Sequence, residues 1–267
     1  MYEYGKGKLI MKNIEFGCNT FTVDDQFKKA PYDTLYALKE MGYSYTEDSV
    51  FGFYSAAKLR DMLNKSGMRM LSLHCMIEDL EKWFDPIVEF VENIQGGTKY
   101  IGCPVLRGSS RNEEGYKIEA GVMNQLGKRL KERGLKYVYH NHAFEFESYG
   151  DKCGQDILLE YTDPEYVNFE LDTYWIKFAG QDPVEYIRKF AGRCPVVHLK
   201  DLTTDEDKKK APFAPVGEGI LDFEKIISTA MECGVKDFLV EQDVKYKPSL
   251  ECAKSSCDTI KKILEIL

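Results

Sequence analysis

Residues 192–201 read Gly-Arg-Cys-Pro-Val-Val-His-Leu-Lys-Asp, and they contain the unit that decides the fold. A glycine follows a helical pattern, a short apolar run comes next, and polar side chains stand where the run ends. Glycine suits the left-handed position just past the end of a helix, because it has no Cβ to clash there. The same unit recurs along the chain at these glycines: Gly42, Gly67, Gly134, Gly192 and Gly234.

Eight short apolar runs alternate with helical patterns over the whole chain. The runs cover residues 14–21, 43–47, 69–74, 99–104, 136–142, 167–172, 195–201 and 238–243. The helical patterns cover residues 31–41, 56–64, 80–94, 113–133, 156–161, 183–190, 222–233 and 250–267. Strands that alternate with helices favour a parallel sheet with the helices outside it. Eight such units in 267 residues predict one α/β domain, a single (β/α)8 TIM barrel.

Two details refine this prediction. Residues 1–12 are expected to be an N-terminal extension, and residues 248–267 the helix that closes the barrel. The alternative fold is an open doubly wound sheet, which often carries a glycine-rich phosphate turn after its first strand. Here the first strand runs into Gly17-Cys18-Asn19-Thr20 without that turn, which disfavours nucleotide binding.

The composition is that of an ordinary globular chain with an acidic surface. Apolar residues make up 43% and charged residues 30%, and 36 basic against 44 acidic side chains give a net charge of −8. Such a surface repels phosphate backbones, so nucleic acid is not expected as a partner. The eight cysteines are scattered and form no CxxC pair, which predicts reduced thiols. The run Asp205–Lys210 is expected to be a solvated loop, or the edge of a lid.

The location of the protein follows from what the chain does not contain. The first 13 residues have no apolar segment typical of a signal peptide, and no apolar stretch approaches the length of a bilayer span. We therefore expect a cytoplasmic protein with no membrane partner. The sequence leaves open whether it forms a homo-oligomer.

Polar side chains gather where the predicted strands end. The chain has only four histidines, His74, His140, His142 and His198, and each lies at or near the C-terminal end of a strand. Acidic residues join them there, namely Glu47, Asp172 and Glu241. In a TIM barrel these strand ends form the catalytic face. One such histidine is easily explained by a hydrogen bond in the interior, but four together indicate a functional site.

Strand alternation sends several of these groups into the barrel interior. His140 and His142 share one parity on strand five, as do His198 and Lys200 on strand seven. A buried charge is costly unless it is paired or bound to a metal. Converging imidazoles and carboxylates suit one divalent ion, which could be Mn, Co, Mg, Zn or Fe. The alternative is a buried network of ion pairs and hydrogen bonds without a metal.

Five motifs in the second half of the chain resemble a known superfamily. They are YHNHAFEFE (139–147), ELDTYWIKFAGQDPVEYI (170–187), GRCPVVHLKD (192–201), VGEGILDFEKI (216–226) and VEQD (240–243). Taken in order, they resemble the sugar phosphate isomerase/epimerase superfamily, the xylose isomerase-like TIM barrels. The resemblance covers strands five to eight closely and the first half mainly by layout.

The resemblance implies a metal site with one ligand from each of strands five to eight. Position by position, the ligands would be Asp172, His198 and Glu241. Strand five departs from the pattern, because His140-Asn141-His142 stands where many members carry Glu-Asn-His. His140 is then the expected fourth ligand, and Glu145 and His142 are its rivals.

The resemblance also implies an activity. We expect a divalent-metal-dependent isomerase or epimerase of a sugar or keto-sugar, phosphorylated or not, that acts through a metal-stabilised enediolate. The residues expected to carry the chemistry are Glu241, His140, Lys200 and Glu145. The residues expected to bind the substrate are Glu47, His74, Arg107, His142 and Trp175. Two alternatives remain: a metal-dependent keto-sugar lyase resembling inosose dehydratases or 3-keto-glycoside-processing barrels, and a non-catalytic carbohydrate-binding subunit.

Overall fold

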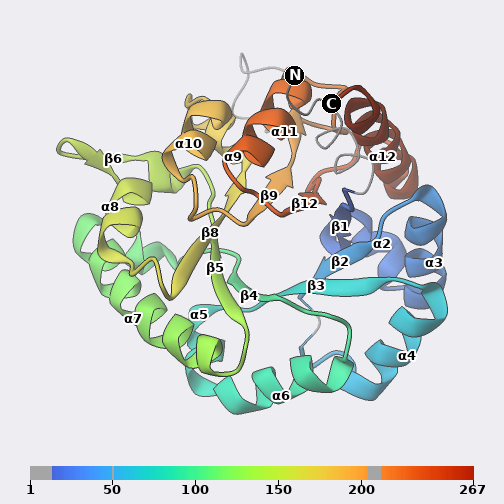
Figure 1. The fold of residues 1–267 in the computed structure, drawn as a ribbon, viewed down its shortest axis with the longest axis horizontal. Helices are drawn as coiled ribbons and strands as arrows, with labels where there is room; N and C mark the ends of the chain where they lie inside the picture. Colours follow the sequence, from blue (N-terminus) through green and yellow to red (C-terminus); the bar gives the residue numbers. More distant parts are fainter. Residues whose placement is uncertain (1–13, 50, 204–211) are drawn as a thin grey trace, which may run out of the picture.

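Eight parallel strands close into a barrel in the computed structural model, which describes residues 14–49, 51–203 and 212–267 (Figure 1). The strands, in their order around the barrel, are β1 (Gly17–Asn19), β12 (Asp237–Val240), β9 (Val196–Leu199), β8 (Val167–Asp172), β5 (Lys136–His140), β4 (Tyr100–Cys103), β3 (Arg69–His74) and β2 (Tyr45–Asp48). The predicted (β/α)8 TIM barrel is confirmed, and the open doubly wound sheet is excluded.

Helices surround the barrel and cover its outer face (Figure 1). They are α2 (Asp24–Phe27), α3 (Pro31–Met41), α4 (Ala56–Ser66), α5 (Ile77–Lys82), α6 (Phe84–Ile94), α7 (Glu113–Glu132), α8 (Gly154–Tyr161), α9 (Thr173–Phe178), α10 (Pro183–Lys189), α11 (Phe223–Glu232) and α12 (Ser249–Ile266). Short 3-10 turns lie at Thr20–Val23 (η1), Gly108–Ser110 (η2) and Phe144–Phe146 (η3). Two small antiparallel pairs of strands, β6 (Ser148–Tyr149) with β7 (Lys152–Cys153) and β10 (Asp201–Leu202) with β11 (Phe213–Ala214), lie outside the barrel. Within the described residues, no helix is both long and apolar enough to cross a membrane.

The glycines that mark the repeating unit have the predicted backbone. All five have positive φ, from 72° at Gly67 to 119° at Gly42. At Gly42 and Gly67 the backbone amide closes the end of the preceding helix, α3 and α4 respectively. The left-handed conformation lets the chain turn at once into the next strand.

Several predicted boundaries were wrong. The apolar run 14–21 contributes only Gly17–Asn19 to the barrel, and the pattern 80–94 is two helices, α5 and α6, that meet at Trp83. Helix α9 was not expected, and strand β5 ends at His140, so His142 lies in the following loop. The run Asp205–Lys210 lies outside the described residues.

The interior of the barrel is layered. Apolar and aromatic side chains from six strands fill its N-terminal end: Tyr45, Leu71, Tyr100, Val138, Val196 and Leu239. The Tyr45 hydroxyl accepts a hydrogen bond from the amide of Phe238 at 3.1 Å, which ties strand β2 to β12 across the interior. Ionisable side chains occupy the interior from this layer up to the C-terminal strand ends.

A register shift between β2 and β3 sets the direction of His74. Leu71 belongs to the interior layer, whereas Leu73 packs in the core between strands and helices. Strict alternation counted from Leu71 would turn Leu73 inward and His74 outward. The pairing of the two strands shifts between Thr46 and Glu47, and beyond the shift these two directions are exchanged. Such irregularities re-aim single side chains. Gly102 on the neighbouring strand leaves room for the imidazole, because a Cβ there would lie 2.7 Å from Cδ2 of His74.

Candidate metal centre

Four buried side chains converge at the C-terminal strand ends, and we call them the outer cluster: His140, Asp172, His198 and Glu241. Each offers one donor atom, and the four atoms lie within 4.8 Å of one another. Nε2 of His140 is 3.3 Å from Oδ2 of Asp172, and Nδ1 of His198 is 3.1 Å from Oε2 of Glu241. The structure therefore brings together the four residues predicted to bind a metal.

Neighbouring groups orient His140. Its Nδ1 lies 3.1 Å from the carbonyl oxygen of Pro104, which can only accept, so Nδ1 carries the donated proton. In the neutral ring the lone pair is then on Nε2, which faces Asp172 and lies 3.8 Å from Oε2 of Glu241. A lone pair directed at two carboxylates is repulsive unless a proton or a metal cation lies between them. A second interaction that fixes the ring in this way is typical of metal-bound histidines.

Asp172 lies at the junction between β8 and α9, where hydrogen bonds fix both its side chain and its backbone. Its Oδ1 caps helix α9 by accepting a hydrogen bond from the amide of Trp175 at 3.0 Å. Its own amide donates to the side-chain oxygen of Asn141, also at 3.0 Å. Oδ2 is left facing His140 and Lys200, so one carboxylate oxygen is structural and the other is directed into the cluster.

Lys200 lies inside the same group of charges, 1% exposed. Its Nζ is 2.7 Å from Oδ1 of Asp243, 3.0 Å from Oε2 of Glu241 and 3.4 Å from Oδ2 of Asp172. Burial alone would lower the pKa of Lys200, but the three carboxylates outweigh it and raise the pKa above its usual value. The amine is therefore a buried ammonium group.

Two other acidic residues, Asp201 and Glu218, do not pair with Lys200. Asp201 instead accepts hydrogen bonds from the amides of Gly217, Gly219 and Leu221, and so shapes the loop before α11. Glu218 pairs with Lys247 on the surface. Asp243, which the sequence placed on the same strand parity as Glu241, is the partner that was missed.

Glu241 is held in its ionised form. Burial pushes its pKa upward, but Lys200 and His198 outweigh burial and hold the pKa well below its usual range. The contacts with His140, His198 and Lys200 all involve Oε2. Oε1 is the oxygen that these three neighbours do not engage.

Glu145 does not join the outer cluster. Both of its oxygens face the backbone and core, because Oε1 accepts from the hydroxyl of Tyr139 at 2.5 Å and Oε2 from the amide of His142 at 2.9 Å. The carboxyl group thus folds the loop after β5. Its predicted roles, as an acid or base and as a rival ligand to His140, have no support in this geometry.

The titration of Glu145 gives a test of this structural role. Burial raises its pKa to about 7, against the hydrogen bonds from Tyr139 and His142 that lower it. The folded protein then binds a proton that the unfolded chain releases near pH 4.5, so stability is lost as pH rises from about 4.5 to 7. We expect the free energy of unfolding of Glu145→Gln not to fall in this way. Between pH 4.5 and 7 its stability relative to the wild type should therefore rise by about 3 kcal/mol.

Urea unfolding at pH 4.5 and 7.5 measures this difference. Glu147→Gln is the matched control, because Glu147 is an exposed carboxylate two residues away. A Glu145→Gln protein whose relative stability does not change with pH would contradict the buried, protonated carboxyl group.

The residues predicted to bind substrate divide into three groups. Arg107 lies apart from the cluster, half exposed and paired with Glu78, so the structure does not support its predicted contact with an anionic group. The rings of His142 and Trp175 lie 5.0 Å apart between centroids, tilted by 35°, and line a pocket of about 440 Å³ with Val105, Arg111 and Phe144. Glu47 and His74 lie deeper in the barrel than the outer cluster.

His142 and Trp175 each have a ring nitrogen without a hydrogen bond within the described residues. Burial lowers the pKa of His142 to about 3, so its ring is neutral at ordinary pH. Nδ1 of His142 and Nε1 of Trp175 are buried and make no hydrogen bond within the described chain. A pocket wall of two aromatic rings with free polar atoms suits the face and hydroxyls of a sugar.

The family model of the xylose isomerase-like TIM barrel matches residues 35–263. The chain belongs to this family. Among its xylose isomerase-like relatives is an inosose dehydratase of Clostridium tetani (strain Massachusetts / E88), 33% identical over 159 residues. That match covers 53% of this chain and 52% of the relative, so the chain spans about half the length of the curated relative.

Solved structures of xylose isomerase-like barrels share the fold. A sugar phosphate isomerase/epimerase from Parabacteroides distasonis superimposes with a TM-score of 0.81 at 22% identity, over 94% of this chain and 98% of the other. An IolI protein with a bound zinc atom superimposes with a TM-score of 0.74 at 15% identity, over 95% of this chain and 99% of the other. At these identities the likeness concerns the fold alone.

Proposed function

We propose that this chain is a divalent-metal-dependent enzyme that enolises a keto-sugar or keto-cyclitol and then eliminates water from it. One observation carries the proposal: the buried ammonium group of Lys200 lies 3.0 Å from Glu241, while strand five offers His140 in place of a second carboxylate. A carboxylate beside an ammonium group forms an unequal pair, a base and an acid. Elimination needs such a pair.

The outer cluster would hold the metal ion. Two imidazoles and two carboxylates are a donor set for Mn, Fe, Co or Zn, and the zinc of the IolI protein supports a metal in a barrel of this fold. The ion would act as a Lewis acid on the substrate carbonyl and its neighbouring hydroxyl, and so acidify the α-proton.

Glu241 and Lys200 would move the protons. Glu241 takes the proton from the carbon next to the carbonyl, and the electron pair of that C–H bond forms the enolate. When the enolate collapses, the β C–O bond breaks and Lys200 gives a proton to the departing oxygen, which leaves as water. The organic product is an α,β-unsaturated ketone; where its α-carbon carries a hydroxyl group, it is the enol of a diketone and tautomerises to it. Transfer of the proton from Glu241 to Lys200 restores both groups, so atoms and charge balance. His142 and Trp175 would orient the substrate ring in the adjacent pocket.

Isomerisation or epimerisation is the second candidate. It shares the enolisation step and differs in that a proton returns to carbon from the other side of the substrate. The name of the Parabacteroides distasonis structure supports this candidate.

Metal analysis followed by isotope exchange tests the proposal. The purified protein is incubated in heavy water with a panel of keto-sugars and keto-cyclitols, with and without a chelator. We expect bound metal, chelator-sensitive deuterium uptake next to the carbonyl, and a product lighter by one water in mass spectrometry. Exchange with conserved mass would indicate an isomerase or epimerase, and neither metal nor exchange would indicate a carbohydrate-binding subunit.

A further inference from the structure

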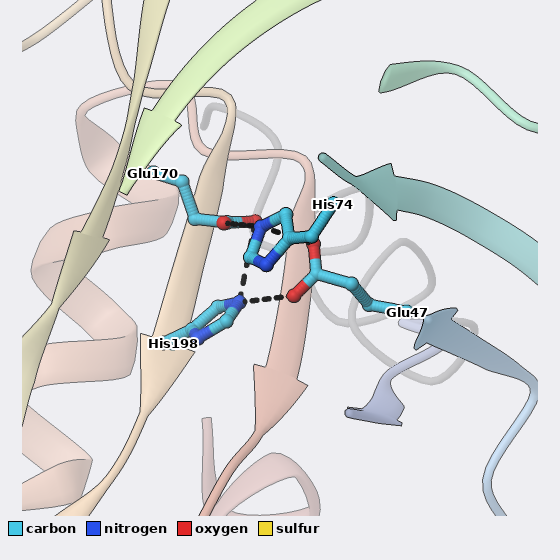
Figure 2. Close-up of side chains that lie close together, drawn as sticks. All are labelled: Glu47, His74, Glu170 and His198. Atoms are coloured by element: carbon cyan, nitrogen blue, oxygen red, sulfur yellow. Dashed lines mark hydrogen bonds and ion pairs between the residues drawn. The ribbon is translucent and has the colours of Figure 1, made fainter. Parts of the chain in front are cut away.

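A second group of donors lies beneath the outer cluster, and we call it the inner cluster: Glu47, His74, Glu170 and His198. Figure 2 shows the four side chains pointing toward one another from strands β2, β3, β8 and β9. Their donor atoms lie within 4.8 Å of one another. Glu47, Glu170 and His198 are fully buried and His74 is 7% exposed. Glu170 is not among the site residues predicted from the sequence, although it has the same strand parity as Asp172.

Each imidazole of the inner cluster faces both carboxylates. Nε2 of His74 is 3.0 Å from Oε1 of Glu47 and 2.7 Å from Oε2 of Glu170. Nε2 of His198 is 2.8 Å from Oε2 of Glu47 and 3.2 Å from Oε1 of Glu170. Two nitrogens and four oxygens therefore surround one small volume in the barrel interior.

Hydrogen bonds account for only part of these approaches. Each Nε2 carries at most one hydrogen, so at most two of the four nitrogen–oxygen contacts can be linear hydrogen bonds. One of them is, between His74 and Glu170. Within the described residues, Nε2 of His198 is buried without a hydrogen bond, because the ring points between the two carboxylates rather than at either oxygen. Oε1 of Glu47 and Oε1 of Glu170 are buried and unbonded in the same way.

We propose that the inner cluster binds a second divalent cation and that His198 bridges the two ions. Nδ1 of His198 faces the outer cluster at 3.1 Å from Glu241, and Nε2 faces the inner cluster. Two imidazole nitrogens and two carboxylates suit Zn, and also Mn, Fe or Co. A bridging ring has given up both of its protons to solvent. Among the described residues, the ion-pair partners of Glu47 and Glu170 are His74 and His198, and an inner ion would supply the neutralising charge without protonation of these two rings.

The spacing of the donors is close to what an ion requires. Zinc bonds of about 2.0–2.1 Å in a tetrahedral arrangement put neighbouring donors about 3.3–3.4 Å apart. The present separations of 2.7–3.2 Å must widen by a few tenths of an ångström, which rotation of two glutamate side chains supplies. The inner site does not depend on the proposed elimination; it shares only His198 with the outer cluster.

Counting bound metal separates the two clusters. The full chain is freed of metal with a chelator, reloaded with Zn²⁺, passed over a desalting column, and measured by inductively coupled plasma mass spectrometry. We expect two ions per wild-type chain, and one in each of Glu170→Gln, Glu47→Gln and Asp172→Asn. Asp48→Asn is the matched control, because Asp48 is a buried carboxylate beside Glu47 that bonds Thr46 instead, and it should keep two ions.

Each alternative result has a distinct meaning. One ion in the wild type that Asp172→Asn loses and Glu170→Gln keeps would overturn the inner site and leave the outer one intact. One ion that Glu170→Gln and Glu47→Gln lose and Asp172→Asn keeps would support the inner site and contradict the proposed function. Circular dichroism establishes that each variant is folded. If the inner variants do not fold, the wild-type count decides, since a value of one would overturn the proposal.

Discussion

Glu241→Gln is expected to lower turnover by about 10²–10⁴-fold, the usual effect of removing a positioned base. The amide has the size of the carboxylate but cannot take a proton from carbon, and it is a poor ligand for a hard divalent ion. Metal affinity should therefore fall together with turnover. Steady-state rates and zinc titrations on the same protein measure both effects.

The control for Glu241 is a buried glutamate elsewhere. Glu119 in helix α7 is also buried, and it accepts a hydrogen bond from Ser110 at 2.6 Å, away from the barrel interior. Glu119→Gln should keep both metal binding and turnover. Full activity in Glu241→Gln would remove Glu241 from the mechanism, whereas equal losses in both variants would point to a general loss of folding.

Lys200→Met should destabilise the metal-free protein by about 3–5 kcal/mol, because it leaves buried carboxylates without their cation. Asp172, Glu241 and Asp243 all lie within 3.4 Å of the ammonium group. A divalent ion would offset part of the same negative charge. The variant should therefore gain more stability from added Zn²⁺ than the wild type does.

Thermal unfolding with and without Zn²⁺ measures both effects. Lys247→Met is the matched control, since Lys247 forms an exposed pair with Glu218, and such pairs contribute about 0–1 kcal/mol. Lys200→Met should also keep deuterium exchange while losing elimination, because Lys200 acts only on the departing oxygen. A variant as stable as the wild type without metal would show that the carboxylates do not need this cation.

The barrel and the outer cluster could be predicted because both follow from local rules. Left-handed glycines and strand parity depend on neighbouring residues, so Gly42 or His198 can be interpreted from the sequence around it. The strand-five ligand was harder to choose among His140, His142 and Glu145. The end of β5 favours His140, because His142 lies past the last strand residue and Glu145 is bound by Tyr139.

The inner cluster could not be predicted because it depends on register between strands. Glu170 reaches His74 only because four strands align at one height in the barrel, and His74 points inward only through the shift between β2 and β3. Asp243 was missed for a related reason. Its partner Lys200 is on a neighbouring strand, and the sequence alone does not tell which of several nearby acids it contacts.

The apolar layer at the N-terminal end of the barrel affects how metal ions would enter and leave. Tyr45, Tyr100 and their four aliphatic neighbours are buried and packed together, so the N-terminal end of the barrel offers no polar path to the clusters above them. An ion bound in the inner cluster would then enter from the C-terminal end, past the outer cluster, and leave by the same route. The inner ion would therefore bind before the outer one and dissociate after it. A metal or substrate bound at the outer cluster would slow the release of the inner ion.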